Sequence, residues 1–201
     1  MFFRIFLLLT LSVLLLQAAS RPYVGFSLES GYGLITQENS EIPNVDVDPI
    51  LYGGKFNVGI DNGEDFRTNI YMGIDYVDSD IYSYIDASGV EQGSTSQFLY
   101  SVGFEVIRTY SSRGSSTLPY LKGGMDYGFM PLHGYAQSWA NNVGFTFGGG
   151  SFMRAGSAEL QLGLYYKYRL WGNYNLDTPQ TQNVELTDHS LLIDFGMNFY
   201  Y

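Results

Sequence analysis

Few side chains in this sequence can take part in acid–base or nucleophilic chemistry. It has no cysteine and only two histidines, His133 and His189. Ser190 follows His189, and a serine activated by a histidine is a common arrangement for acyl transfer. Neighbouring residues of a strand point to opposite faces, so these two cannot form a dyad without a partner from another strand. We predict no catalytic residue, and a partner on a neighbouring strand stays open as the alternative.

Three further motifs have the composition of ligand sites but not the spacing. The glycines 148–150 are not followed by the Lys-Ser/Thr and helix of a phosphate loop, so we interpret them as space and bending within a strand. The stretches DVD (46–48) and DSD (78–80) lack the downstream glycine and glutamate of a calcium loop. The sequence therefore predicts no cofactor and no metal.

The elements that position the remaining side chains are strands, because apolar and polar residues alternate with period two. In the last of these segments, for example, Ile193, Phe195 and Met197 alternate with Asp194 and Gly196. Eight such segments are present, at 23–34, 51–61, 66–76, 97–106, 120–129, 143–152, 159–170 and 191–201.

Apart from Asp61, which also opens the short connection 61–65, eleven charged residues fall inside the eight segments, and all of them share the polar face. The five basic and six acidic residues nearly cancel, and glycines on the same face leave room for Tyr71, Tyr165 and Tyr200. This composition is typical of a confined interior in which opposite charges pair, while the apolar face suits lipid. The predicted interior charge network is Glu29, Lys55, Arg67, Asp75, Glu105, Lys122, Asp126, Glu159, Lys167, Arg169 and Asp194.

The first twenty residues have the layout of a cleavable signal peptide. Arg4 precedes a leucine-rich stretch shorter than the ~20 residues of a membrane-spanning helix, and Ala18, Ala19 and Ser20 offer a cleavage site. No other stretch is long and apolar enough to span as a helix. Charged residues make up only 15 % of the chain, which also contains 18 Tyr and 24 Gly. We expect a signal peptide at 1–20 and one membrane β-barrel domain at 21–201.

Connections between the segments alternate between long and short. The long ones are 35–49, 77–95, 130–142 and 172–187, and the short ones are 61–65, 109–117 and 154–157. Outer-membrane barrels have long external loops, short periplasmic turns and an even number of strands. The predicted fold is therefore all-β, an eight-stranded antiparallel up-and-down transmembrane β-barrel.

The last segment ends in a pattern that resembles the assembly signal of outer-membrane barrels. It has a polar residue, a glycine and two aromatic residues at fixed spacing, namely Asp194, Gly196, Phe199 and Tyr201. The mature chain as a whole resembles the small eight-stranded barrels of the OmpA transmembrane domain, OmpX and opacity-protein type. The resemblance implies the Gram-negative outer membrane, extracellular loops and periplasmic termini. It further implies contact with membrane lipid, lipopolysaccharide and the barrel assembly machinery. OmpA continues into a cell-wall-binding domain that we do not expect here.

The expected loops are strongly acidic. They contain no Lys or Arg, which disfavours nucleic acid and favours cationic partners or divalent ions. We expect a structural or surface-interaction role, as in adhesion, and the alternatives are an outer-leaflet lipid-modifying enzyme or a narrow channel. The eleven acids counted with the loops are Glu38, Glu41, Asp46, Asp48, Asp78, Asp80, Asp86, Glu91, Asp177, Glu185 and Asp188, the last of which directly follows the loop 172–187.

Overall fold

A computed structural model of the chain describes residues 20–39, 45–63, 65–78, 84–85, 91–92, 94–95, 98–110, 116–133, 138–172, 174–175 and 183–201. The predicted signal peptide therefore lies outside the described residues, apart from Ser20. Eight long strands form the body of the protein: β1 (Arg21–Asn39), β3 (Ile50–Asp61), β4 (Phe66–Val77), β8 (Phe98–Thr109), β9 (Thr117–His133), β10 (Trp139–Ala155), β11 (Ala158–Trp171) and β13 (Asn183–Tyr200).

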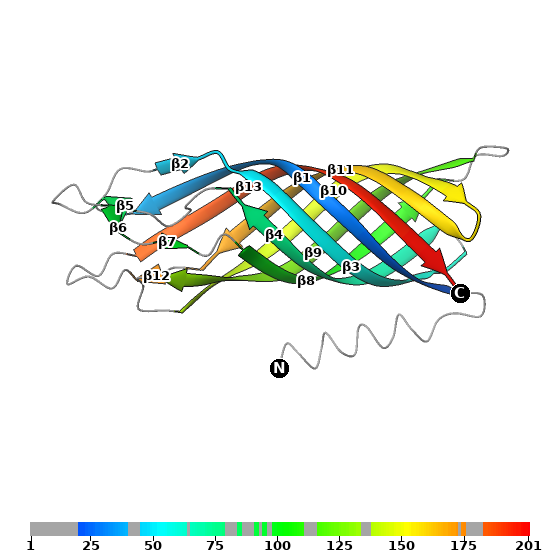
Figure 1. Ribbon diagram of the computed structural model, residues 1–201, viewed down its shortest axis with the longest axis horizontal. Coiled ribbons are helices and arrows are strands. Elements are labelled where there is room, and N and C mark those ends of the chain that lie inside the picture. Colours follow the sequence, from blue (N-terminus) through cyan, green and yellow to red (C-terminus); the bar gives the residue numbers. More distant parts are fainter. Residues whose placement is uncertain are drawn as a thin grey trace.

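These strands form one closed antiparallel barrel (Figure 1). Each pairs with its neighbours in chain order, and β13 closes the barrel by pairing with β1 from Tyr23–Tyr200 to Asn39–Val184. The predicted eight-stranded antiparallel barrel is confirmed. Among the described residues, no helix is long and apolar enough to cross a membrane.

Short strands extend the sheet at the end of the barrel that carries the long loops. There β2 (Val45–Val47) pairs with β1, β7 (Ser94–Thr95) with β9 and β12 (Tyr174–Asn175) with β13. A separate hairpin joins β5 (Tyr84–Ile85) and β6 (Glu91–Gln92). The C-terminus lies at the opposite end, beside the short turns (Figure 1). We call these the loop end and the turn end.

Several strands are longer than predicted. The expected loop 130–142 shrinks to the five residues between β9 and β10, and β13 begins at Asn183 although the sequence placed a loop up to Thr187. Near the loop end the inward positions change from polar to apolar, as at Ile35, Met130 and Leu186. The polar–apolar alternation disappears there while the backbone pairing continues, so pattern alone ended these strands too early.

The short turns follow from their residues. Gly63, in the predicted turn after β3, adopts φ of 71°, and its backbone N–H donates to the Asp61 carboxylate at 3.0 Å. Gly156 adopts φ of 68° in the two-residue connection between β10 and β11. Positive φ in a two-residue hairpin matches the right-handed twist of the strands, and glycine adopts it without steric cost.

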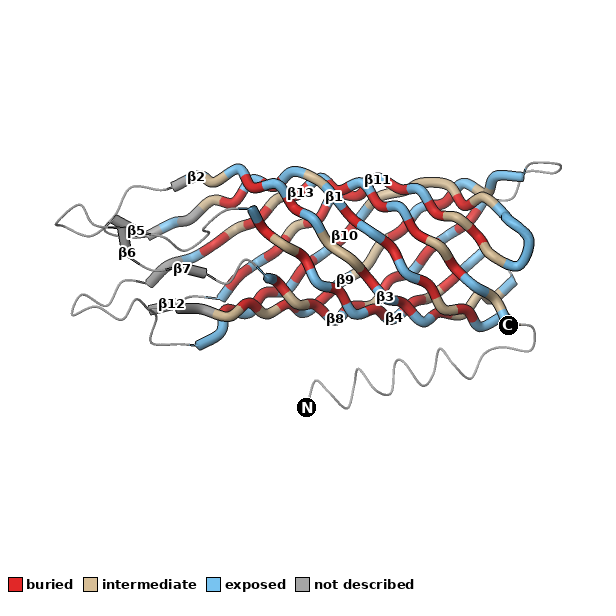
Figure 2. Tube along the Cα trace, viewed as in Figure 1, coloured by how far each residue is buried: buried red, intermediate tan, exposed pale blue. Residues whose placement is uncertain are grey.

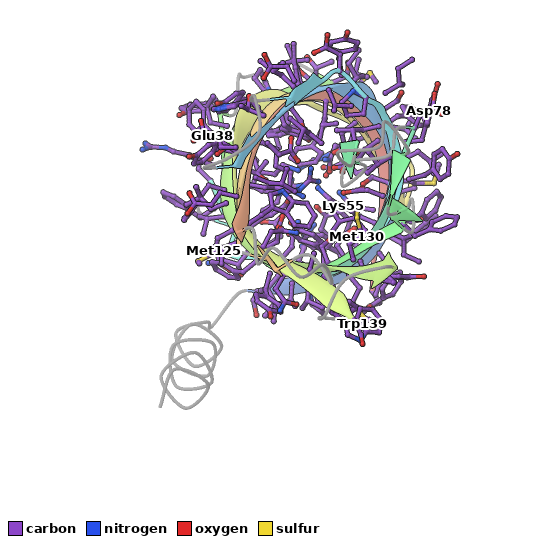
Figure 3. All side chains as sticks on the ribbon, turned by 90° about the vertical axis from the view of Figure 1, so that its left-hand side faces the viewer. Glu38, Lys55, Asp78, Met125, Met130 and Trp139 are labelled. Carbon is purple, nitrogen blue, oxygen red and sulfur yellow. The ribbon has the colours of Figure 1, made fainter. Side chains whose placement is uncertain are left out.

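Burial alternates along most of each long strand (Figure 2). Away from the loop end, the buried side chains are mainly polar or tyrosine, whereas the exposed ones are mainly apolar. Met72, Phe147 and Leu28 are 64–65 % exposed, whereas Lys167 and Arg169 are at most 1 % exposed. Viewed from the loop end, Lys55 and Met130 point into the barrel, while Met125 and Trp139 point outward (Figure 3). A protein that folds in water distributes these residue types the other way round.

Candidate functional site in the barrel interior

All eleven charged residues of the predicted network lie inside the barrel. None is more than 7 % exposed, and each takes part in at least one ion pair. The pairs form four separate groups along the barrel axis. Because a buried charge is costly unless an opposite charge or a hydrogen bond compensates it, these pairs determine whether the interior is stable.

The group nearest the loop end is centred on Arg169. Its two terminal nitrogens donate to Asp188 at 2.6 Å and to Asp75 at 2.7 Å, and the Ser190 hydroxyl donates to Asp188 at 2.5 Å. The sequence assigned Asp188 to a solvated loop. That prediction is wrong, because β13 begins earlier than expected and directs Asp188 inward, where it is 1 % exposed.

The middle group is the largest and alternates acid and base. Lys55 contacts Glu29 and lies 3.7 Å from Glu105, while Lys122 lies 3.0 Å from Glu105 and 3.8 Å from Asp194. Lys122 also lies over the Tyr165 ring, 3.6 Å from its centroid. Three carboxyl groups thus share two lysines in this group.

A single pair stands beside the middle group. The Lys167 ammonium lies 2.7 Å from the Asp126 carboxylate, and the Tyr71 hydroxyl donates to the same carboxylate at 2.7 Å. Lys167 and Asp126 are both fully enclosed. This group is therefore electrically balanced.

The group at the turn end is centred on Arg67. The guanidinium binds Glu159 through both terminal nitrogens and lies 3.3 Å from Asp61 through Nε. It also lies over the Phe152 ring, 4.3 Å from the centroid. Asp61 was not among the eleven predicted residues, because the sequence placed it at the start of a turn. Its side chain is 22 % exposed and borders a cavity of about 230 Å³ that also contacts Arg21 and Arg154.

Tyrosines occupy the space that inward glycines leave. A Cβ added at Gly103 would lie 2.4 Å from the Tyr71 ring, and one at Gly163 would lie 2.3 Å from the Tyr165 hydroxyl. Tyr165 and Tyr120, whose hydroxyls are 2.5 Å apart, also lie beside Gly148 and Gly150 of the glycine triplet. The triplet therefore provides interior space, as the sequence indicated, and side chains fill the interior.

Apolar side chains from all eight long strands meet at the loop end of the interior. We call this cluster the apolar layer, and each member is at most 7 % exposed. On β4, β11 and β13 it lies next to the inward positions of the Arg169 group. Sequence reasoning missed it, because half-buried strands were expected to keep their apolar residues outside. The layer consists of Ile35, Leu51, Val77, Leu99, Met130, Ala140, Trp171, Leu186 and Leu192.

The candidate acyl-transfer residues do not come together. Ser190 points inward onto Asp188, whereas His189 pairs outside with the Tyr166 hydroxyl at 2.5 Å and packs on Tyr168. The two residues therefore face opposite sides of the wall, as predicted. His133 ends β9, and its side chain is outside the described set. No group of His, Cys, Asp or Glu within the described ranges could hold a metal ion.

The expected acidic surface is described only in part. Glu38, Asp46, Asp48, Asp78 and Glu185 are exposed at the loop end. Glu41, Asp80, Asp86 and Asp177 lie outside the described residues, as does the side chain of Glu91.

The four residues of the C-terminal pattern lie on the closing strand and just after it. Asp194 and Gly196 face the interior, whereas Phe199 and Tyr201 are 39 % and 73 % exposed on the outer surface. Phe199 stacks on Phe26 of β1, with ring centroids 6.3 Å apart.

Comparison with known proteins finds likeness in structure alone. No protein-family model and no curated protein matches the sequence. The outer-membrane protein OprG of Pseudomonas aeruginosa superposes with a TM-score of 0.59 at 9 % identity, over 92 % of this chain and 97 % of that one. Neisserial surface protein A superposes with a TM-score of 0.50 at 15 % identity, over 88 % and 97 %. The chain has the fold of the small outer-membrane β-barrels. The resemblance that the sequence indicated is confirmed at the level of this small-barrel fold.

Proposed function

We propose that the protein is an integral barrel of the Gram-negative outer membrane, with a filled interior and a role that its loops carry out. The observation that carries this proposal is the reversed distribution of polarity. Large apolar side chains cover the outer wall, and every charge of the predicted network is enclosed. An outer wall covered by apolar side chains suits the hydrocarbon core of a bilayer. A closed barrel also leaves no strand edge unpaired in that hydrocarbon.

Aromatic residues on the outer wall support a position for the barrel in the bilayer. Towards the loop end, Phe129 packs between Tyr100 and Trp139, with centroids 5.5 and 5.6 Å away, and Tyr76 packs on Phe98 at 5.5 Å. Towards the turn end, Arg108 lies over the ring of Phe66. Aromatic belts lie at membrane–water interfaces. The difference in length between the loops and the turns supports an orientation with the loops outside and the turns in the periplasm.

A structural or surface-interaction role fits this interior better than transport or catalysis. The apolar layer and the Arg169 group obstruct the path between the two ends, and the His189–Ser190 pair is divided by the barrel wall. The surface that is available for interaction lies at the loop end, where five of the described acids are exposed.

Electrical recordings distinguish the filled barrel that we propose from the channel alternative. Purified protein in planar lipid bilayers is expected to show no steady conductance, because apolar and ion-paired side chains fill the interior. Protease protection of the same preparation establishes that the barrel has inserted. Large, stable single-channel steps from inserted wild-type protein would contradict the proposal.

We also propose that the acidic loop end attracts cationic partners or divalent ions. A variant with Glu38→Gln, Asp46→Asn, Asp48→Asn and Asp78→Asn is expected to bind fewer divalent ions or cationic peptides, as measured by titration of reconstituted protein. Binding to the wild type should weaken with salt, because charges beyond roughly 8–10 Å are screened. Thermal stability should change little, since exposed charges contribute little to it.

Asp65→Asn provides a control for this experiment, because Asp65 is exposed in a turn at the opposite end. Equal loss of binding in the control and the loop variant would show that general charge, not the loop surface, is responsible. Unchanged binding in the loop variant would remove the proposed partner class.

A further inference from the structure

The seam that closes the barrel places two buried acids directly opposite each other. In the register between β1 and β13, Glu29 is the partner of Asp194, and they are 4 % and 1 % exposed. Like charges directly opposite in a sheet are destabilising, and the effect grows where water is excluded. The seam therefore needs a compensating charge at this level.

The nearby lysines compensate Glu29 well and Asp194 poorly. Lys55 of β3 contacts Glu29, and it lies closer to Glu29 than to Glu105 of β8. Lys122 of β9 lies 3.0 Å from Glu105 but 3.8 Å from Asp194. With all five groups ionised, three carboxylates and two lysines leave one negative charge uncompensated. The distances place it on Asp194.

The two carboxyl oxygens of Asp194 also differ in their hydrogen bonds. Its Oδ2 atom accepts from the Tyr165 hydroxyl at 2.7 Å and from Gln161 Nε2 at 2.5 Å, both on β11. Tyr120 of β9 reaches this cluster through the Tyr165 hydroxyl. The Oδ1 atom of Asp194 is buried and has no hydrogen-bond partner among the described residues. An ionised carboxylate can only accept, whereas a carboxylic acid carries one donor.

We propose that Asp194 carries a proton in the folded barrel, so that closing the seam takes up one proton from water. The proton binds the Asp194 carboxylate to give a neutral carboxylic acid, with Oδ1 as the oxygen available to hold it. Repulsion across the Glu29–Asp194 register pair is then removed, and the middle group becomes neutral with two carboxylates and two lysines.

Proton uptake has a definite consequence for stability. In the unfolded chain an exposed aspartate loses its proton above about pH 4. If the folded chain keeps that proton, the folded state binds one proton more, and the folding equilibrium constant falls about tenfold for each pH unit above that point. The stabilisation is fully present at low pH and is lost as pH rises. Asp194→Asn removes this contribution, because its amide is neutral at every pH.

The experiment compares the full-length wild type, Asp194→Asn and Glu29→Gln, refolded into lipid vesicles. Urea unfolding is measured from about pH 5 to about pH 9. We expect Asp194→Asn to reduce the fall of the equilibrium constant with pH by about one power of ten per unit relative to wild type. Glu29→Gln tests the charge count, because it neutralises the opposite acid of the same pair and leaves Glu105 and Asp194 to balance the two lysines. Asp194 can then ionise, so this variant should show the same reduced pH dependence. A pH dependence in Glu29→Gln equal to that of the wild type would contradict the proposal.

Infrared spectroscopy gives a second readout that needs no variant to be stable. The folded wild type at neutral pH should show the carbonyl stretch of a protonated carboxylic acid, and Asp194→Asn should lack it. Absence of that band in wild type overturns the proposal, as does a band that persists in Asp194→Asn. A stability that rises with sodium concentration at fixed ionic strength, with no protonated band, would show that a metal cation neutralises the seam instead.

Discussion

Replacing Arg169 with Met is expected to lower the free energy of unfolding of the barrel by about 3–5 kcal/mol. The guanidinium is 1 % exposed and donates to two enclosed carboxylates, Asp75 and Asp188. Removing it leaves both acids buried without an opposite charge, and the Ser190 hydroxyl is a small compensation for one of them. Removing one partner of a buried group costs far more than the intact group contributes to stability.

Urea unfolding in lipid vesicles, followed by tryptophan fluorescence, measures this effect. Arg108→Met is the matched control, because Arg108 is exposed on the outer wall over the rings of Phe66 and Tyr110. Its loss should cost no more than about 1 kcal/mol. The triple variant Arg169→Met, Asp75→Asn, Asp188→Asn should recover much of the stability. Equal, small effects of Arg169→Met and Arg108→Met would mean that the interior charges are solvated and not paired.

Deleting residues 199–201 is expected to abolish assembly, the largest effect that we predict. Phe199 pairs with Val24 and stacks on Phe26, and Tyr200 packs on Tyr23 with ring centroids 5.4 Å apart. The deletion removes these contacts at the turn end of the seam together with half of the proposed assembly signal. Backbone groups of β1 and β11 would then lie unpaired in hydrocarbon.

Membrane fractionation and immunoblotting of cells that express the deletion should show periplasmic degradation products in place of outer-membrane protein. Phe199→Leu with Tyr201→Leu is the control for backbone pairing, because it keeps the ladder and the apolar surface but removes the aromatic pattern. If only the deletion fails, strand closure is decisive, and if both fail, the aromatic pattern is. Normal levels of the deletion variant in the outer membrane would refute the signal.

The eight strands and the direction of their side chains could be predicted because period two is a local property. Arg67, for example, shares its face with Asn69 and Asp75 of β4, and no knowledge of the rest of the fold is needed to place it inward. The partner of each charge is a different matter. Arg67 binds Glu159, 92 residues away, and that choice depends on register and on distances across the interior that no local pattern contains.

The loop-end boundaries were predicted poorly for a related reason. Ile35 and Met130 occupy inward positions, where the pattern led us to expect polar residues, so the strands seemed to end before them. The backbone ladder continues because its hydrogen bonds do not depend on side-chain polarity. Once the strands are extended, the same residues form the apolar layer, and Asp188 moves from a loop to the interior. Ending the strands too early thus hid both the apolar layer and the interior position of Asp188.

The seam between β1 and β13 also bears on the order of folding events. Each of the other seven ladders joins two long strands that follow one another along the chain. In the ladder between β1 and β13, by contrast, the paired residues Glu29 and Asp194 are separated by almost the entire domain. Contacts between distant residues form slowly, so this ladder is expected to form last. Until it does, each chain has two unpaired edges, which could join those of a second chain. A β13 edge that meets a foreign β1 in the native register brings the same two acids together. Outside the enclosed barrel both are ionised, and their repulsion disfavours the joining of two chains.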